Sequence, residues 1–251
     1  MLNYLKYPRF EIDNESKLIN KISVLLKFYF TTFLFTLLSV GLITTIDSIV
    51  VNYLHQNSIW SEIRNSNIKI KNMFGRYSLV VIVIIIPFIE ELIFRLPLNL
   101  KKSGIAISIS VLYLRFSGNF LTHVLDLRKM EDLVKIFISL LIFILLMNLL
   151  NQKKLDLIKD KYYKQYFYFI AISFGLIHII NFHQINYFLF FLYPIYVLPQ
   201  FFMGLFIGNI RIRYGFIWGW ALHALINSTS FPVPSFSLPQ SNHRQFSSPE
   251  R

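Results

Sequence analysis

Long apolar runs separated by short polar connections set the pattern of this chain. Runs of 18 or more residues with few charges predict membrane-spanning helices, because about 20 helical residues cross the hydrocarbon core of a bilayer. The pattern predicts an all-α integral membrane protein, a polytopic bundle of about seven (six to eight) transmembrane helices. The predicted spans cover residues 24–46, 78–100, 104–121, 133–150, 165–182, 187–210 and 214–230.

The polar ends of the chain frame this membrane domain. We expect a polar N-terminal segment over residues 1–23, a polytopic membrane domain over 24–230, and a disordered tail over 231–251. The tail is rich in Ser and Pro and has no apolar run, which is the composition of chains that cannot form a core.

Composition agrees with a membrane protein and excludes several other classes. Hydrophobic residues make up 55% of the chain and charged residues only 15%, whereas an ordinary soluble domain has about 25% charged residues. A disordered chain and a collagen are excluded. The chain has no Cys, so disulfides and thiol catalysis are excluded as well.

The net charge of +12 does not point to nucleic acid, because most Lys and Arg flank the apolar runs, where they meet lipid headgroups. With seven spans, thirteen Lys and Arg lie on the N-terminal side and eight on the other. This bias predicts a cytoplasmic N-terminus. We expect an integral protein of a bacterial cytoplasmic membrane, with the lipid bilayer but no nucleic acid among its partners.

Two adjacent carboxylates interrupt the second predicted span. A charge at the bilayer centre costs about 2.5–3.5 kcal/mol, so Glu90 and Glu91 need a reason to be there. One alternative is that they mark a helix end before Lys101. If the helix continues, Glu91 and Arg95 lie four residues apart and can pair on one face, which leaves Glu90 free for a proton, water or metal. The pattern does not decide which glutamate is the base.

Further ionisable and amide side chains occupy the fifth and seventh predicted spans. These spans run antiparallel to the second, so His178, His223 and Asn227 are expected at the depth of the glutamates. A lone histidine inside a membrane is as often a hydrogen-bonding group as a ligand. Together, His and carboxylate side chains suit zinc. Alternatively, a glutamate activates water while His and Asn stabilise an oxyanion.

Three short patterns in chain order now stand out: Glu90-Glu91-x-x-x-Arg95, Phe174-x-x-x-His178 and His223-x-x-x-Asn227. In these residues the chain resembles the CPBP family of intramembrane proteases, which includes the CAAX prenyl endopeptidases and bacteriocin-immunity relatives. The resemblance covers about residues 78–230. The sequence departs from the family pattern in two ways. The gap between the first and the second pattern is longer by about two spans, and Leu96-Pro97 follows the arginine directly. His123 lies closer to the usual distance from the first pattern, but it has no Phe four residues before it.

The resemblance implies an intramembrane endopeptidase that cuts a membrane-associated peptide or a lipidated protein. It implies that one of the two glutamates activates the attacking water. His178, His223 and Asn227 would complete the site, with Arg95 and Phe174 in support. If a divalent metal is bound, zinc is the expected ion, with Glu90, His178 and His223 as ligands; a metal-free glutamate mechanism is the other possibility.

Two other classes of function fit the same pattern. One is a non-catalytic immunity or scaffold protein of the same fold, which would bind a partner without cutting it. The other is a proton- or ion-coupled transporter subunit, in which buried ionisable groups form a path. Arg115, inside the third predicted span, is not explained by these functions: it can pair with Glu90 or Glu91, face a polar cavity, or extend to the membrane interface.

Overall fold

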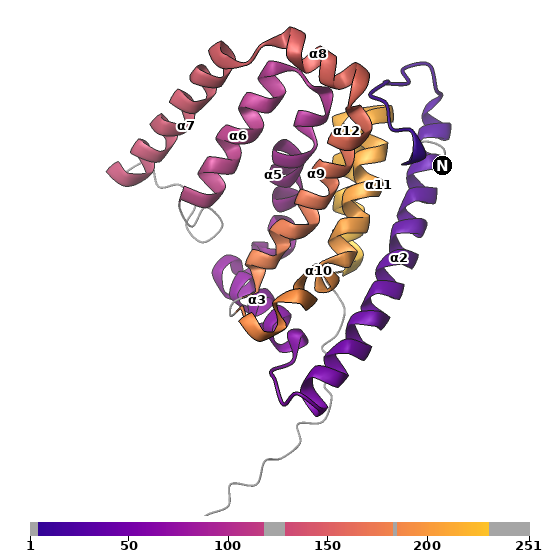
Figure 1. Ribbon diagram of the computed structural model, residues 1–251, viewed down its shortest axis with the longest axis vertical. Coiled ribbons are helices and arrows are strands. Elements are labelled where there is room, and N and C mark those ends of the chain that lie inside the picture. The colour runs from indigo at the N-terminus through magenta and orange to yellow at the C-terminus, as the bar shows by residue number, and fades with distance from the viewer. Residues whose placement is uncertain (1–4, 118–128, 183–184, 231–251) are drawn as a thin grey trace, which may run out of the picture.

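A computed structural model describes residues 5–117, 129–182 and 185–230 (Figure 1). These residues form helices and their connections, and none of them lies in a β-strand. The all-helical prediction is therefore confirmed for the described part of the chain. The tail over 231–251 and His123 lie outside the described residues.

The helices follow one another with short connections. In chain order they are α2 (Leu18–Asn52), α3 (Ile59–Phe74), η1 (Gly75–Tyr77), α4 (Ser78–Val80), the π-helical turn η2 (Val81–Ile85), α5 (Ile86–Phe94), η3 (Leu96–Asn99), α6 (Lys102–Ser117), α7 (Met130–Leu149), α8 (Gln152–Lys161), α9 (Tyr163–Ile177), η4 (His178–Asn181), η5 (Tyr187–Leu192), α10 (Tyr193–Tyr196), α11 (Leu198–Tyr214) and α12 (Phe216–Ser230).

Three helical segments among the described residues are long and apolar enough to cross a membrane: Leu18–Asn52, Met130–Leu149 and Tyr187–Tyr214. The other predicted spans form shorter helices. α9 and α12 have 15 residues each, which corresponds to about 23 Å at 1.5 Å per residue, less than a hydrocarbon core of about 30 Å. The structure thus supports a membrane protein, and the seven-span bundle stays a prediction.

The outer surfaces of the long helices are apolar. In α2, Phe30 and Leu38 expose more than half of their surface, and in α7 so does Phe137. Apolar faces of this extent mark contact with a membrane or a partner rather than with water.

The first long helix is longer than the sequence pattern predicts. α2 begins at Leu18 and ends at Asn52, whereas the pattern places the span at residues 24–46. Its C-terminal part is held by Asp47, whose carboxylate accepts hydrogen bonds from the Ser58 hydroxyl and, at 2.7 Å, from the Ile59 amide. This link joins the end of α2 to the start of α3.

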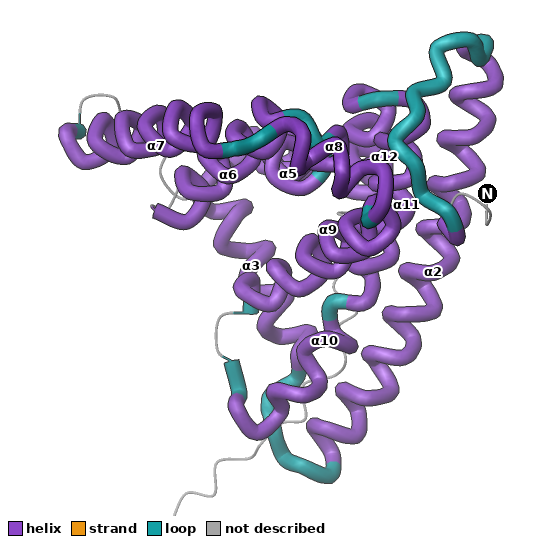
Figure 2. The backbone as a smooth tube through the Cα atoms, turned by 45° about the horizontal axis from the view of Figure 1, so that its top comes forward, coloured by secondary structure: helices purple, strands orange, loops and turns teal. Residues whose placement is uncertain are grey.

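The centre of the molecule is a group of helices packed around α11, which contacts α2, α9 and α12. Figure 2 shows α6 and α7 side by side at the edge of this group. α9 and α11 approach closely because glycines line their contact: a Cβ on Gly204 would lie 2.9 Å from the carbonyl oxygen of Ala171. The two helices can therefore carry side chains from distant parts of the sequence to one place.

This close approach predicts that Gly204→Ala destabilises the protein. The added methyl group meets a backbone carbonyl, and overpacking of this kind costs about 1–3 kcal/mol. Gly41→Ala on α2 is the matched control, because a Cβ there meets no atom within 4 Å, and Ala is favoured over Gly in a helix by up to about 1 kcal/mol. Thermal unfolding in detergent should show a lower midpoint for the first variant only; equal midpoints would contradict the packing argument.

Candidate active site

Both glutamates lie in the middle of α5, about one helical turn after an irregular turn. Residues 81–85 form the π-helical turn η2, and Pro87 stands in the first turn of α5. A π turn inserts an extra residue into the helical repeat and leaves backbone carbonyls without their usual helical partners. Two side chains of α12 bond to such carbonyls: Trp220 Nε1 donates to Ile84 O at 3.2 Å, and Asn227 Nδ2 donates to Ile82 O at 3.1 Å.

Glu91 is fully buried in a cluster of charged side chains. Its Oε1 lies 3.8 Å from Arg95 Nε and 3.0 Å from His223 Nδ1. Arg95 is itself only 1% exposed, and its guanidinium lies 4.0 Å from the centre of the Phe174 ring. The arginine thus balances the Glu91 carboxylate and stacks on an aromatic face. The pairing of Glu91 with Arg95 expected from their spacing is present.

Glu90 lies in a different environment, with 24% of its side chain exposed. Its Oε2 is 3.4 Å from His223 Nε2 and its Oε1 is 3.9 Å from His178 Nε2. Three helical segments supply these groups: α5, η4 and α12. The structure therefore brings together the three residues that the sequence pattern singles out as candidate ligands.

The hydrogen bonds of the two imidazoles limit their tautomers. His178 Nδ1 lies 2.7 Å from the Phe174 carbonyl oxygen, which can only accept, so Nδ1 carries a proton. In the neutral ring Nε2 is then an acceptor facing Glu90. His223 Nδ1 faces the Glu91 carboxylate and is a donor for the same reason. The Glu90 carboxylate therefore faces His178 Nε2 and His223 Nε2. When the rings are neutral all three groups are acceptors, so they need a hydrogen-bond donor between them.

A small cavity of about 40 Å³ lies beside Glu90, large enough for water. Its lining combines polar side chains with apolar walls, namely Glu90, Ile93, Phe94, Leu112, Arg115, Phe116, Ile177, His178, Ile180 and Asn181. Arg115 thus lines the same cavity as Glu90. Of the alternatives that the sequence leaves open for Arg115, the structure supports the one in which it faces a polar cavity.

The sequence pattern does not predict the places of two further residues in this region. Arg211, grouped there with the cations flanking the membrane, is only 5% exposed. Gly219 lets α12 approach, since a Cβ there would lie 3.1 Å from Glu91 Oε2 and 3.3 Å from the Arg211 Cβ. A small residue is therefore required beside the buried carboxylate, and the sequence gives no signal for it.

The predicted metal ligands Glu90, His178 and His223 lie close to one another. No group of three His, Cys, Asp or Glu side chains among the described residues is arranged to hold a metal ion. Asn227 bonds to the backbone of η2 instead of to Glu90. The donor chemistry suits zinc, and zinc binding stays a prediction.

Comparisons of the chain with protein-family models, with curated proteins and with solved structures find no match. What the site does is therefore argued from its own residues.

The buried ion pair predicts different stabilities for two neighbouring variants. Glu91→Gln leaves Arg95 as an uncompensated buried charge, so we expect a loss of about 3 kcal/mol or more. Glu90→Gln removes a partly exposed carboxylate and should cost about 1 kcal/mol or less. Unfolding in detergent followed by circular dichroism measures both. Equal losses would show that Glu91 does not carry the structural role.

Proposed function

We propose that the protein is an intramembrane endopeptidase with a glutamate-activated water, embedded by about seven spans in a bacterial cytoplasmic membrane with its N-terminus in the cytoplasm. The observation that carries the proposal is the convergence of the Glu90 carboxylate with the Nε2 atoms of His178 and His223 beside a water-sized cavity. A water molecule can donate to two of these acceptors at once. Groups of this kind at membrane depth are costly and are kept where chemistry needs them.

In the proposed reaction Glu90 is the general base. Water donates to its carboxylate, and Glu90 takes that proton as the water oxygen attacks the carbonyl carbon of the peptide bond. The carbonyl becomes a tetrahedral oxyanion. When the C–N bond breaks, Glu90 returns the proton to the leaving amine, so the products are a carboxylic acid and an amine.

The histidines orient the water and stabilise the oxyanion in this scheme. His178 Nε2 accepts from the water, because its Nδ1 proton is fixed on the Phe174 carbonyl. His223 has a carboxylate at each ring nitrogen. Its Nδ1 donates to Glu91, which holds the ring with Nε2 3.4 Å from Glu90. The proton that Glu90 takes from the water can be shared with His223 Nε2, and from there it donates a hydrogen bond to the oxyanion.

Glu91, Arg95 and Asn227 act as positioning residues in the proposal. Glu91 orients the His223 ring, and Arg95 balances its charge. Asn227 ties α12 to the π turn that precedes Glu90. The proposed substrate is a membrane-associated peptide or a lipidated protein, because the glutamate lies among helices with apolar outer surfaces.

The proposal predicts that Glu90→Gln abolishes cleavage without unfolding the protein. The amide cannot take a proton from water, so the rate should fall about 10³-fold. The assay measures cleavage of a panel of membrane-tethered peptides by protein reconstituted in vesicles. Glu131→Gln, which changes an exposed carboxylate at the start of α7, is the matched control and should keep wild-type activity.

Two outcomes of this assay would contradict the proposal. If wild type cleaves and Glu90→Gln cleaves equally fast, Glu90 is not the base. If wild type cleaves nothing in the panel while it binds a partner as tightly as the variant does, the protein is a scaffold.

The proposed steps predict that cleavage does not depend on a metal. They use Glu90, water and the two imidazoles whose Nε2 atoms face Glu90. Dialysis against a strong chelator should leave the rate unchanged, and zinc should be far below one ion per chain by mass spectrometry. Stoichiometric zinc that disappears in His223→Ala would contradict this prediction and favour a zinc peptidase.

A further inference from the structure

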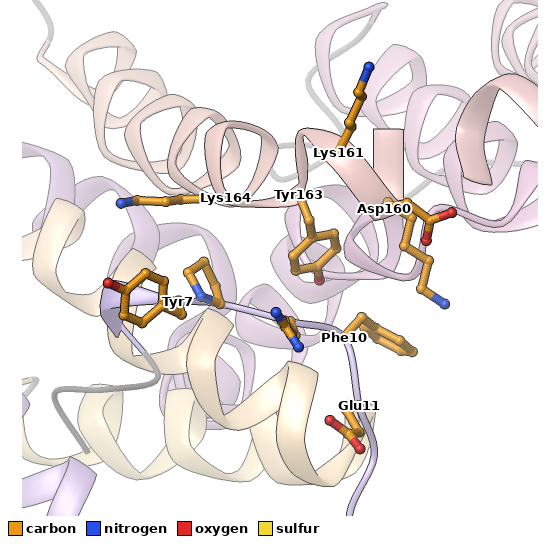
Figure 3. Close-up of a pocket in the computed structure, with 10 residues that line it drawn as sticks. Tyr7, Phe10, Glu11, Asp160, Lys161, Tyr163 and Lys164 are labelled. Atoms are coloured by element: carbon orange, nitrogen blue, oxygen red, sulfur yellow. The ribbon is translucent and has the colours of Figure 1, made fainter. Parts of the chain in front are cut away.

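A second and larger cavity lies far from Glu90 in sequence, between the N-terminal segment and the junction of α8 and α9 (Figure 3). Its volume is about 490 Å³. The lining residues are Tyr7, Pro8, Arg9, Phe10, Glu11, Lys159, Asp160, Lys161, Tyr163 and Lys164.

Cations outnumber anions in this lining, with Arg9 and three lysines against Glu11 and Asp160. Among the described residues, no carboxylate lies within ion-pair distance of any of these four cations. Aromatic rings accompany them instead: Lys164 Nζ lies 5.8 Å from the centre of the Tyr7 ring, and Lys159 Nζ lies 5.5 Å from that of Phe10.

The directions of the side chains separate two kinds of lining residue. In Figure 3 Lys164 extends toward the side of Tyr7, whereas the ends of Lys161 and Asp160 point away from Tyr163. A buried cation lies behind the cavity, because the Arg211 guanidinium is 5.7 Å from the Phe10 ring. The cavity therefore presents positive charge that the described carboxylates do not neutralise.

Backbone hydrogen bonds hold the N-terminal wall of the cavity in place. The amide of Glu11 donates to the Ile212 carbonyl at 3.2 Å, and the amide of Asp13 donates to the Arg213 carbonyl at 2.7 Å. Hydrogen bonds from Ser16 lower the pKa of the Asp13 carboxyl. This carboxylate is bonded to Ser16 and does not line the cavity. The wall is thus fixed to the C-terminal end of α11.

We propose that this cavity binds the phosphate group of an anionic lipid headgroup. Clustered Lys and Arg with unpaired charge are the partners that phosphate oxygens prefer, and basic pockets beside membrane helices on the cytoplasmic side bind such headgroups. The surroundings favour a lipid over a soluble phosphate, because Tyr7, Leu157 and Tyr162 each expose half or more of their surface nearby in the chain. Aromatic and apolar side chains of this kind lie at the membrane interface. The inference is independent of the proposed protease activity.

The test measures lipid binding to the full-length protein in detergent by native mass spectrometry. Titrations use phosphatidylglycerol, which is anionic, and phosphatidylcholine, whose charges cancel. Lys159→Ala/Lys164→Ala should weaken phosphatidylglycerol binding about 30-fold, because each lysine near an anionic surface contributes a factor of roughly five. Lys153→Ala/Lys154→Ala is the matched control: it removes two exposed lysines of α8 outside the cavity lining and should change binding less than about threefold.

Any of three other results would overturn the proposal. Equal losses in both double variants would show that the general charge of this face attracts the lipid, and equal binding of the two lipids would show no recognition of an anionic headgroup. If inorganic phosphate displaces phosphatidylglycerol from wild type and itself binds as tightly, the ligand is a soluble anion. All variants replace exposed lysines, and circular dichroism verifies that each is folded.

Discussion

The buried pair of Glu91 and Arg95 is the interaction on which the rest of the site depends. A carboxylate that is fully buried among apolar helices is stable only if a charge of opposite sign and hydrogen-bond donors compensate for its lost hydration. Arg95 supplies the charge from one turn further along, and His223 supplies a donor from α12. The Phe174 ring then covers the guanidinium, so that α5, α9 and α12 are joined at one point.

The contacts of α12 and of the π turn before α5 surround this buried pair. Gly219 allows α12 to pass the Glu91 carboxylate, and two side chains of the same helix bond to the carbonyls of the π turn before α5. The turn sets the direction of α5 after an otherwise regular apolar run. As a result Glu90, next to a buried and neutralised carboxylate, faces two imidazoles and a small cavity instead of lipid.

Arg211 lies between the two polar regions of the molecule. One side of it borders the Gly219 contact beside Glu91, and the other faces Phe10, which lines the basic cavity. The buried Arg211 side chain thus reaches from the helix contact beside Glu91 to a wall of the basic cavity. Ionisable groups thus lie inside an apolar shell near α5, while Arg9, Lys159, Lys161 and Lys164 line the separate basic cavity.

The sequence by itself determined the helical class, the long apolar runs and the identity of the ionisable residues inside them, because apolar periodicity and the cost of buried charge are properties of the local chain. It also predicted the pairing of Glu91 with Arg95, which depends only on helical spacing. Tertiary structure alone decided that Glu90 faces the two histidines, that Arg115 joins its cavity, and that Arg211 is buried. It also decided that Asn227 bonds to a π turn. These contacts join residues far apart in the chain, and side-chain direction at a helix crossing is set by packing, which no local pattern encodes.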